Sequence, residues 1–118
     1  MNLDHILETL VLQVHGALGA IFIDREGEAI SQYANFSSER IKLMGAHYGI
    51  AWLEAQDLTG RHLQSSSPEM ILWMEKGICL MKPLEKDYLV FLILEPSGSV
   101  GQARRWLGWA LEEIRKEI

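Results

Sequence analysis

The sequence has one cysteine, three prolines and no long apolar run. Because Cys79 has no partner, it cannot form an intrachain disulfide, which agrees with a reducing compartment. The longest apolar run, residues 89–94, is far too short to cross a bilayer, and residues 1–4 lack the basic start of a secretory signal. We therefore expect a cytoplasmic protein that does not insert into a membrane.

Basic residues are also scarce, with 11 against 16 acidic ones. They are scattered along the chain, and no basic cluster is longer than the pair Arg104 and Arg105. Binding to a phosphate backbone requires many basic side chains close together. The sequence therefore predicts no nucleic-acid partner.

Motifs for metal binding, nucleophilic catalysis and nucleotide binding are missing. No two of the four histidines lie three or four residues apart, and Cys79 has no neighbouring ligand. The serines at 65–67 are not in a Gly-x-Ser-x-Gly turn, and Gly16 and Gly19 precede a strand rather than the helix of a phosphate loop. We expect no cofactor, no metal and no enzyme activity. The histidines are His5, His15, His47 and His62.

With 118 residues, 48% of them hydrophobic, the chain can build one ordinary core, so we expect a single domain over residues 1–118. Periodicity and turn residues predict the order helix, two strands, helix, three strands, helix. The predicted helices cover residues 2–15, 38–58 and 99–118. The predicted strands cover residues 20–23, 28–33, 69–75, 77–82 and 87–94.

Several residues mark the ends of these elements. Gly16 and Gly19 can take the positive φ that ends a helix, and residues 24–27 have the composition of a turn between strands. Ser37 is one of two candidate N-caps for the second helix, which we expect to end before Gly60. At the last helix, Ser99 and residue 102 have the spacing of a capping box.

Two apolar patterns determine the predicted layers. The strand at 87–94 has no polar face, so helices should cover both faces of the sheet in an α+β fold. The second helix has more apolar residues than one buried face requires, which suggests a second contact. One stripe is Ile41, Met44, Tyr48, Ala51 and Ala55, and the second is Leu43, Ala46, Ile50 and Leu53.

Within the strand at 69–75, residues 70–74 are apolar on both faces, and this strand can lie at the edge of the sheet. Pairing with a second copy would protect this edge, with the second stripe of the helix beside it. The alternative is an internal strand and a merely buried helix. The predicted dimer interface is Met70, Ile71, Leu72 and Trp73, with Leu43 and Ile50.

The element order and several motifs resemble the Roadblock/dynein light chain domain family over nearly the whole chain. This resemblance implies a five-stranded antiparallel sheet of order 2-1-5-4-3, with the second helix on one face and the terminal helices on the other. It also implies dimers formed through the third strand and second helix. The motifs are Val14-x-Gly16-Ala17-x-Gly19-Ala20, Ile21-Phe22-Ile23-Asp24-Arg25-Glu26-Gly27-Glu28, Gly77-Ile78-Cys79-Leu80-Met81-Lys82-Pro83-Leu84 and Gly101-Gln102-Ala103-Arg104.

For function, the resemblance implies a homodimeric regulator or scaffold that binds a small Ras-like GTPase. Two alternatives stay open, a small-molecule-binding sensory module and a purely structural dimerisation domain. Arg25, in the predicted turn, is a candidate arginine finger, although exposed turn arginines are common. The predicted GTPase-facing surface is Arg40, Leu43, His47, Ile50 and Glu54 on the second helix.

Overall fold

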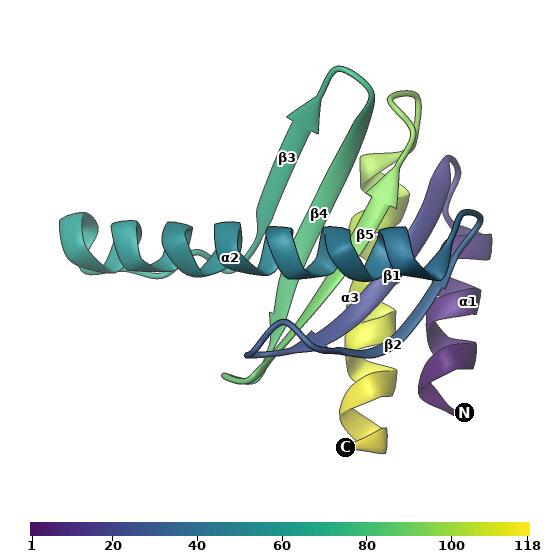
Figure 1. Ribbon diagram of the computed structural model, residues 1–118, viewed down its shortest axis with the longest axis horizontal. Coiled ribbons are helices and arrows are strands. Elements are labelled where there is room, and N and C mark those ends of the chain that lie inside the picture. Colours follow the sequence, from purple (N-terminus) through teal and green to yellow (C-terminus); the bar gives the residue numbers. More distant parts are fainter.

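The computed structural model describes residues 1–118 and has the predicted element order (Figure 1). One five-stranded antiparallel sheet has the strand order β2-β1-β5-β4-β3, which confirms the α+β fold class and its topology. None of the helices is both long and apolar enough to cross a membrane. The elements are α1 (Leu3–Gln13), β1 (Ala17–Asp24), β2 (Ala29–Ala34), α2 (Ser38–Leu63), β3 (Met70–Met74), β4 (Gly77–Leu84), β5 (Tyr88–Leu94) and α3 (Val100–Glu117).

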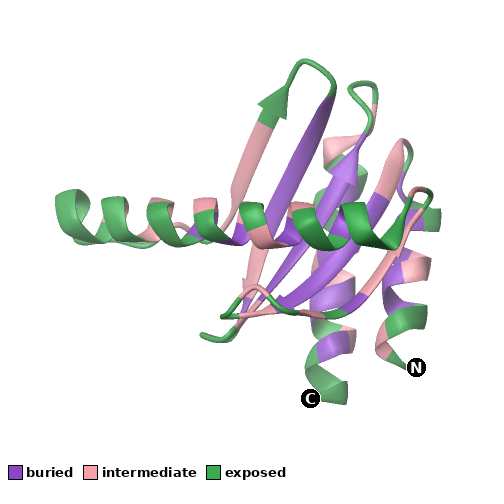
Figure 2. Ribbon diagram, in the orientation of Figure 1, coloured by how far each residue is buried: buried purple, intermediate pink, exposed green.

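Helices cover both faces of the sheet, as the apolar strand β5 predicts. Alternate residues of the central strands belong to two separate cores. The central strands are mostly buried (Figure 2). Phe22 and Leu92 belong to the core under α1 and α3, whereas Ile21 and Phe91 belong to the smaller core under α2. Burial of both faces explains why β5 has no polar side.

The turn chemistry around β1 is only partly as predicted. Gly16 and Gly27 have φ of +82° and +85°, as expected for a helix end and a hairpin turn. The prediction for Gly19 is wrong, because this residue lies inside β1. A Cβ atom there would lie 2.8 Å from Ile41 Cδ1 and 2.9 Å from the Cβ of Ala34. Gly19 is therefore needed where the first turns of α2 pack against β1 and β2.

The second helix is longer than predicted. Ser37 is the N-cap, and its hydroxyl accepts a hydrogen bond from the Arg40 N–H. The helix continues through Gly60 to Leu63 and ends at Gln64, whose left-handed backbone (φ 50°) lets its N–H donate to the Thr59 carbonyl. Gly60 is thus helical and does not begin a loop, because a single glycine reduces helix stability without ending the helix.

Small residues bring α2 close to the sheet. The fully buried residues of the helix are Ile41, Gly45, Gly49 and Trp52. Of the first predicted stripe, Ile41 is buried, and Met44 and Tyr48 are partly buried against the same core. A Cβ at Gly45 would lie 2.9 Å from Ile21 Cδ1. The two glycines therefore let the N-terminal half of α2 lie directly on β1, and Trp52 fills the space beyond it.

The prediction of a capping box at the start of α3 is correct for one of its two hydrogen bonds. The Ser99 hydroxyl accepts from the Gln102 N–H at 3.1 Å, as predicted. The Gln102 side chain does not return to the cap, because its Oε1 accepts from the His15 N–H at 2.8 Å. Gln102 therefore joins the start of α3 to the segment between α1 and β1.

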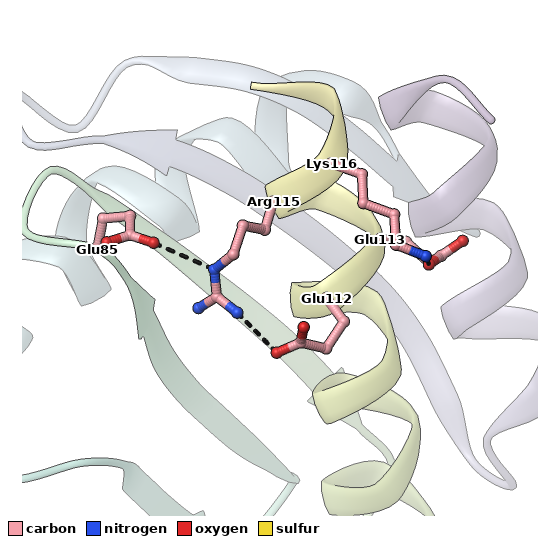
Figure 3. Close-up of polar contacts among 5 residues, drawn as sticks. All are labelled: Glu85, Glu112, Glu113, Arg115 and Lys116. Carbon is pink, nitrogen blue, oxygen red and sulfur yellow. Dashed lines mark hydrogen bonds and ion pairs between the residues drawn. The ribbon is translucent and has the colours of Figure 1, made fainter.

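Charged residues join the C-terminal turns of α3 to the β4–β5 turn. Arg115 lies 3.1 Å from Glu85 and 2.6 Å from Glu112, and Lys116 lies 2.8 Å from Glu113 (Figure 3). The guanidinium of Arg115 donates hydrogen bonds to the carboxylates of Glu85 and Glu112, and these bonds raise the pKa of Arg115. Most of these groups are exposed, so water screens the pairs and each contributes little to stability. Only the Arg115–Glu85 pair holds the turn against the helix, because the other two pairs lie within α3.

Candidate protein-interaction surface

The predicted GTPase-facing residues lie together on the side of α2 that points away from the sheet. Their spacing of three and four residues places them in one row, and all five are exposed. Leu43 is 58% exposed and Ile50 is 56% exposed. Large apolar side chains flanked by charged ones are typical of a protein-binding surface. We call this row the outward face of α2, and it consists of Arg40, Leu43, His47, Ile50 and Glu54.

One end of the outward face is fixed by an aromatic contact. The guanidinium carbon of Arg40 lies 5.2 Å from the centroid of the Phe36 ring, in a cation–π geometry. Nearby, the Tyr48 ring packs edge-on against Phe91 at 6.2 Å, and burial is the main reason that the pKa of Tyr48 is raised. These aromatic contacts therefore hold the N-terminal half of α2 in place, in addition to the residues that it buries against the sheet.

The strand β3 lies at the edge of the sheet and pairs only with β4, so the alternative of an internal strand is wrong. Met70, Ile71 and Leu72 are half-buried, and Trp73 is 68% exposed. The C-terminal half of α2 extends beyond β3 and is largely exposed (Figures 1 and 2). This edge combines unpaired backbone groups with apolar side chains, which is the arrangement that favours pairing with another strand.

Two clefts lie on opposite sides of α2. The first, which we call the turn cleft, has a volume of about 90 Å³ and lies between α2 and the β1–β2 and β4–β5 turns. The second, the edge cleft, has a volume of about 230 Å³ and reaches Met74 at the end of β3 and Lys76 in the β3–β4 turn. Three residues of the second predicted stripe, Ala46, Ile50 and Leu53, line the turn cleft.

Comparisons with known proteins find similar structures but no similar sequence. No family model and no curated protein sequence match the chain. A Roadblock/LC7 domain from Streptomyces avermitilis superposes with a TM-score of 0.91 at 10% identity, over 99% of this chain and 98% of that one. The chain has the Roadblock/LC7 fold.

Two further structures with this fold are similar to the chain. MglB from Myxococcus xanthus has a TM-score of 0.86 at 15% identity, over 97% of this chain and 92% of that one. A structure of MglB with a tetrameric arrangement has a TM-score of 0.85 at 15% identity, over 97% and 85%. These identities are low, so the likeness is one of fold.

Within the Roadblock/LC7 fold, the titratable side chains of this chain are dispersed. No three His, Cys, Asp or Glu side chains lie close enough together to hold a metal ion. Cys79 lies in the core under α2, where burial raises its pKa to about 12. Its burial and the direction of this shift are those of a core residue.

Arg25 lies in the β1–β2 turn, as predicted, and is exposed. Its guanidinium lies 3.3 Å from Asp87, which belongs to the β4–β5 turn. This ion pair joins two turns that line the turn cleft. Sequence reasoning missed the cleft, because residues far apart in the chain form its walls. The one available signal was the second apolar stripe of α2.

Proposed function

We propose that this chain is a non-enzymatic homodimer that binds a small Ras-like GTPase in the cytoplasm, as a regulator or scaffold. The observation that carries the proposal is the outward face of α2, on a fold of the Roadblock/LC7 type. Leu43 and Ile50 supply apolar contact area, while Arg40, His47 and Glu54 supply polar groups around it. An apolar centre with a polar surround is the usual composition of a protein interface.

For self-association, we propose that β3 pairs with β3 of a second copy. This would satisfy the unpaired backbone groups of the edge and cover Met70, Ile71, Leu72 and Trp73. The two α2 helices would then run antiparallel, with the end of each lying over the sheet of the other copy. The predicted contribution of Leu43 and Ile50 to the dimer requires that the two α2 helices contact each other.

We propose that any effect on GTP hydrolysis comes from ordering the switch loops of the GTPase itself. Arg40 is the only arginine on the outward face, and its guanidinium is held over the Phe36 ring. Stabilising a partner's own loops requires no inserted side chain.

The two clefts favour a protein partner over a small-molecule ligand. Their volumes of about 90 and 230 Å³ are below the range of about 300–1,000 Å³ that holds a drug-sized molecule. Every buried side-chain nitrogen and oxygen also has a hydrogen-bond partner, so no polar group in the core requires a ligand.

The direct test is an affinity measurement with purified small Ras-like GTPases, each loaded with GDP or with a non-hydrolysable GTP analogue. We expect one of them to bind in one nucleotide state, and Ile50→Asp to weaken that binding about ten-fold or more. The matched control is Leu12→Asp, because Leu12 is an exposed leucine (67%) on α1, on the other face of the sheet. Unchanged binding by Ile50→Asp would contradict the proposed surface.

A further inference from the structure

We infer that the turn cleft is a docking pocket for one uncharged aliphatic side chain of the GTPase. This inference rests on the proposed function and adds a specific contact to it. The floor of the cleft is apolar and consists of Ile23, Trp52 and Leu89. With a volume of about 90 Å³, the cleft has room for a single side chain and not for a cofactor.

The cleft is continuous with the outward face of α2. Ile50 belongs to both, and Leu53, which is 55% exposed, forms the adjoining wall. Ala46 leaves space between them, because its side chain is a single methyl group. A partner seated on the outward face would therefore cover the mouth of the cleft, where an apolar side chain can leave water.

The charges around the mouth favour an uncharged occupant. The Asp24 carboxylate accepts hydrogen bonds from the N–H groups of Glu26 and Glu28, and Arg25 is paired with Asp87. Three charged side chains at the rim have no ion pair: Asp24, whose carboxylate is held by these two N–H groups, and Glu26 and Lys86, whose charges are opposite. A charged side chain that entered the cleft would lose water against an apolar floor that offers it no hydrogen-bond partner.

A second copy of this chain is not the occupant we infer. A copy paired on β3 would lie along the edge of the sheet, where Met74 of β3 and Lys76 of the β3–β4 turn line the edge cleft. The turn cleft lies on the other side of α2, between the turns at the opposite ends of the strands. Strand pairing through β3 therefore does not cover it.

The first arm of the test fills the cleft. Ala46→Met places a longer side chain in it, and Ala55→Met makes the same change on α2 at a residue that lines neither cleft. The probe is the purified GTPase that binds the unsubstituted protein. We expect Ala46→Met to weaken binding about ten-fold and Ala55→Met to leave it within two-fold, with both variants sedimenting as the unsubstituted protein does.

The second arm identifies the contact directly. A Leu53→Cys variant carries a benzophenone maleimide, which labels the new thiol selectively because Cys79 is fully buried. We expect a photo-crosslink to an aliphatic side chain of the bound GTPase, and none from the same label at Leu12→Cys. Full binding by Ala46→Met, or no crosslink from residue 53 in a complex that Ile50→Asp abolishes, would overturn the cleft inference alone. Failure of every GTPase to bind the unsubstituted protein would overturn the proposed function.

Discussion

At the scale of single residues, the glycines differ in backbone conformation and in the space that a side chain would have. Gly16 combines a φ of +82° with a close approach, because a Cβ there would lie 2.5 Å from the Gly98 Cα. Gly60 lies on an exposed part of α2, where a Cβ atom would be 3.7 Å from its nearest neighbour, the Ser65 carbonyl oxygen. The same substitution should therefore have opposite effects at the two positions.

We expect Gly16→Ala to lower the free energy of unfolding by about 2–4 kcal/mol, since it adds left-handed strain to a backbone overlap. Gly60→Ala should raise it by about 0.5–1 kcal/mol, because alanine is the better helix former. Urea denaturation of the two variants measures both values. A stabilised Gly16→Ala variant would contradict the close contact between the start of β1 and Gly98.

The buried thiol of Cys79 should make stability depend on pH in the alkaline range. Burial raises its pKa from an ordinary value of 9.0 to about 12. Between these values the unfolded chain loses the proton and the folded chain keeps it, so the free energy of unfolding falls as pH rises, by about 1.4 kcal/mol per pH unit. The Cys79→Ala variant should show a shallower fall between pH 9 and 10.5 in urea denaturation. Equal slopes would contradict the burial of the thiol.

At the scale of elements, the start of α3 depends on two separate hydrogen bonds. Ser99→Ala removes the N-cap, and Gln102→Ala leaves the His15 N–H without its partner. Each change should lower the free energy of unfolding by about 1 kcal/mol. Arg105→Ala is the control, since this exposed residue on α3 forms no ion pair and should stay within about 0.5 kcal/mol. Thermal or urea unfolding distinguishes the three variants, and an unaffected Gln102→Ala would contradict the link between α3 and the segment that joins α1 to β1.

Local signals predicted most of the elements, and long-range contacts account for the errors. The caps at Ser37 and Ser99 and the turn at Gly27 depend on neighbouring residues, so they could be predicted from the sequence. The role of Gly19 depends on Ile41, and the second bond of Gln102 depends on a residue 87 positions away. The sequence pattern contains no information on such contacts.

In the candidate site too, the features that depend on local sequence could be predicted, and those that depend on long-range contacts could not. The outward face of α2 could be predicted because helical periodicity alone places its residues in one row. The turn cleft could not, since its walls include Arg25 and Asp87, which lie 62 positions apart. The strand order came from the family resemblance, because antiparallel strands of this length allow several orders.

At the scale of the whole molecule, the exposed edge of the sheet should determine the oligomeric state. We expect the unsubstituted protein to sediment as a dimer and Trp73→Lys to sediment as a monomer, because a charge on β3 opposes strand pairing. Leu12→Lys, on the other face of the sheet, should remain dimeric. Sedimentation velocity over a range of concentrations measures this. A dimeric Trp73→Lys variant would place the interface elsewhere.

The central claim is that the outward face of α2 binds a small Ras-like GTPase, and one capture experiment tests it most directly. The unsubstituted protein and Ile50→Asp are each incubated with native lysate containing a GTP analogue or GDP, and the bound proteins are quantified by mass spectrometry. We predict that a small GTPase is enriched in one nucleotide state by the unsubstituted protein and is lost with Ile50→Asp. No GTPase in either state, or equal capture by the folded, dimeric variant, would contradict the claim.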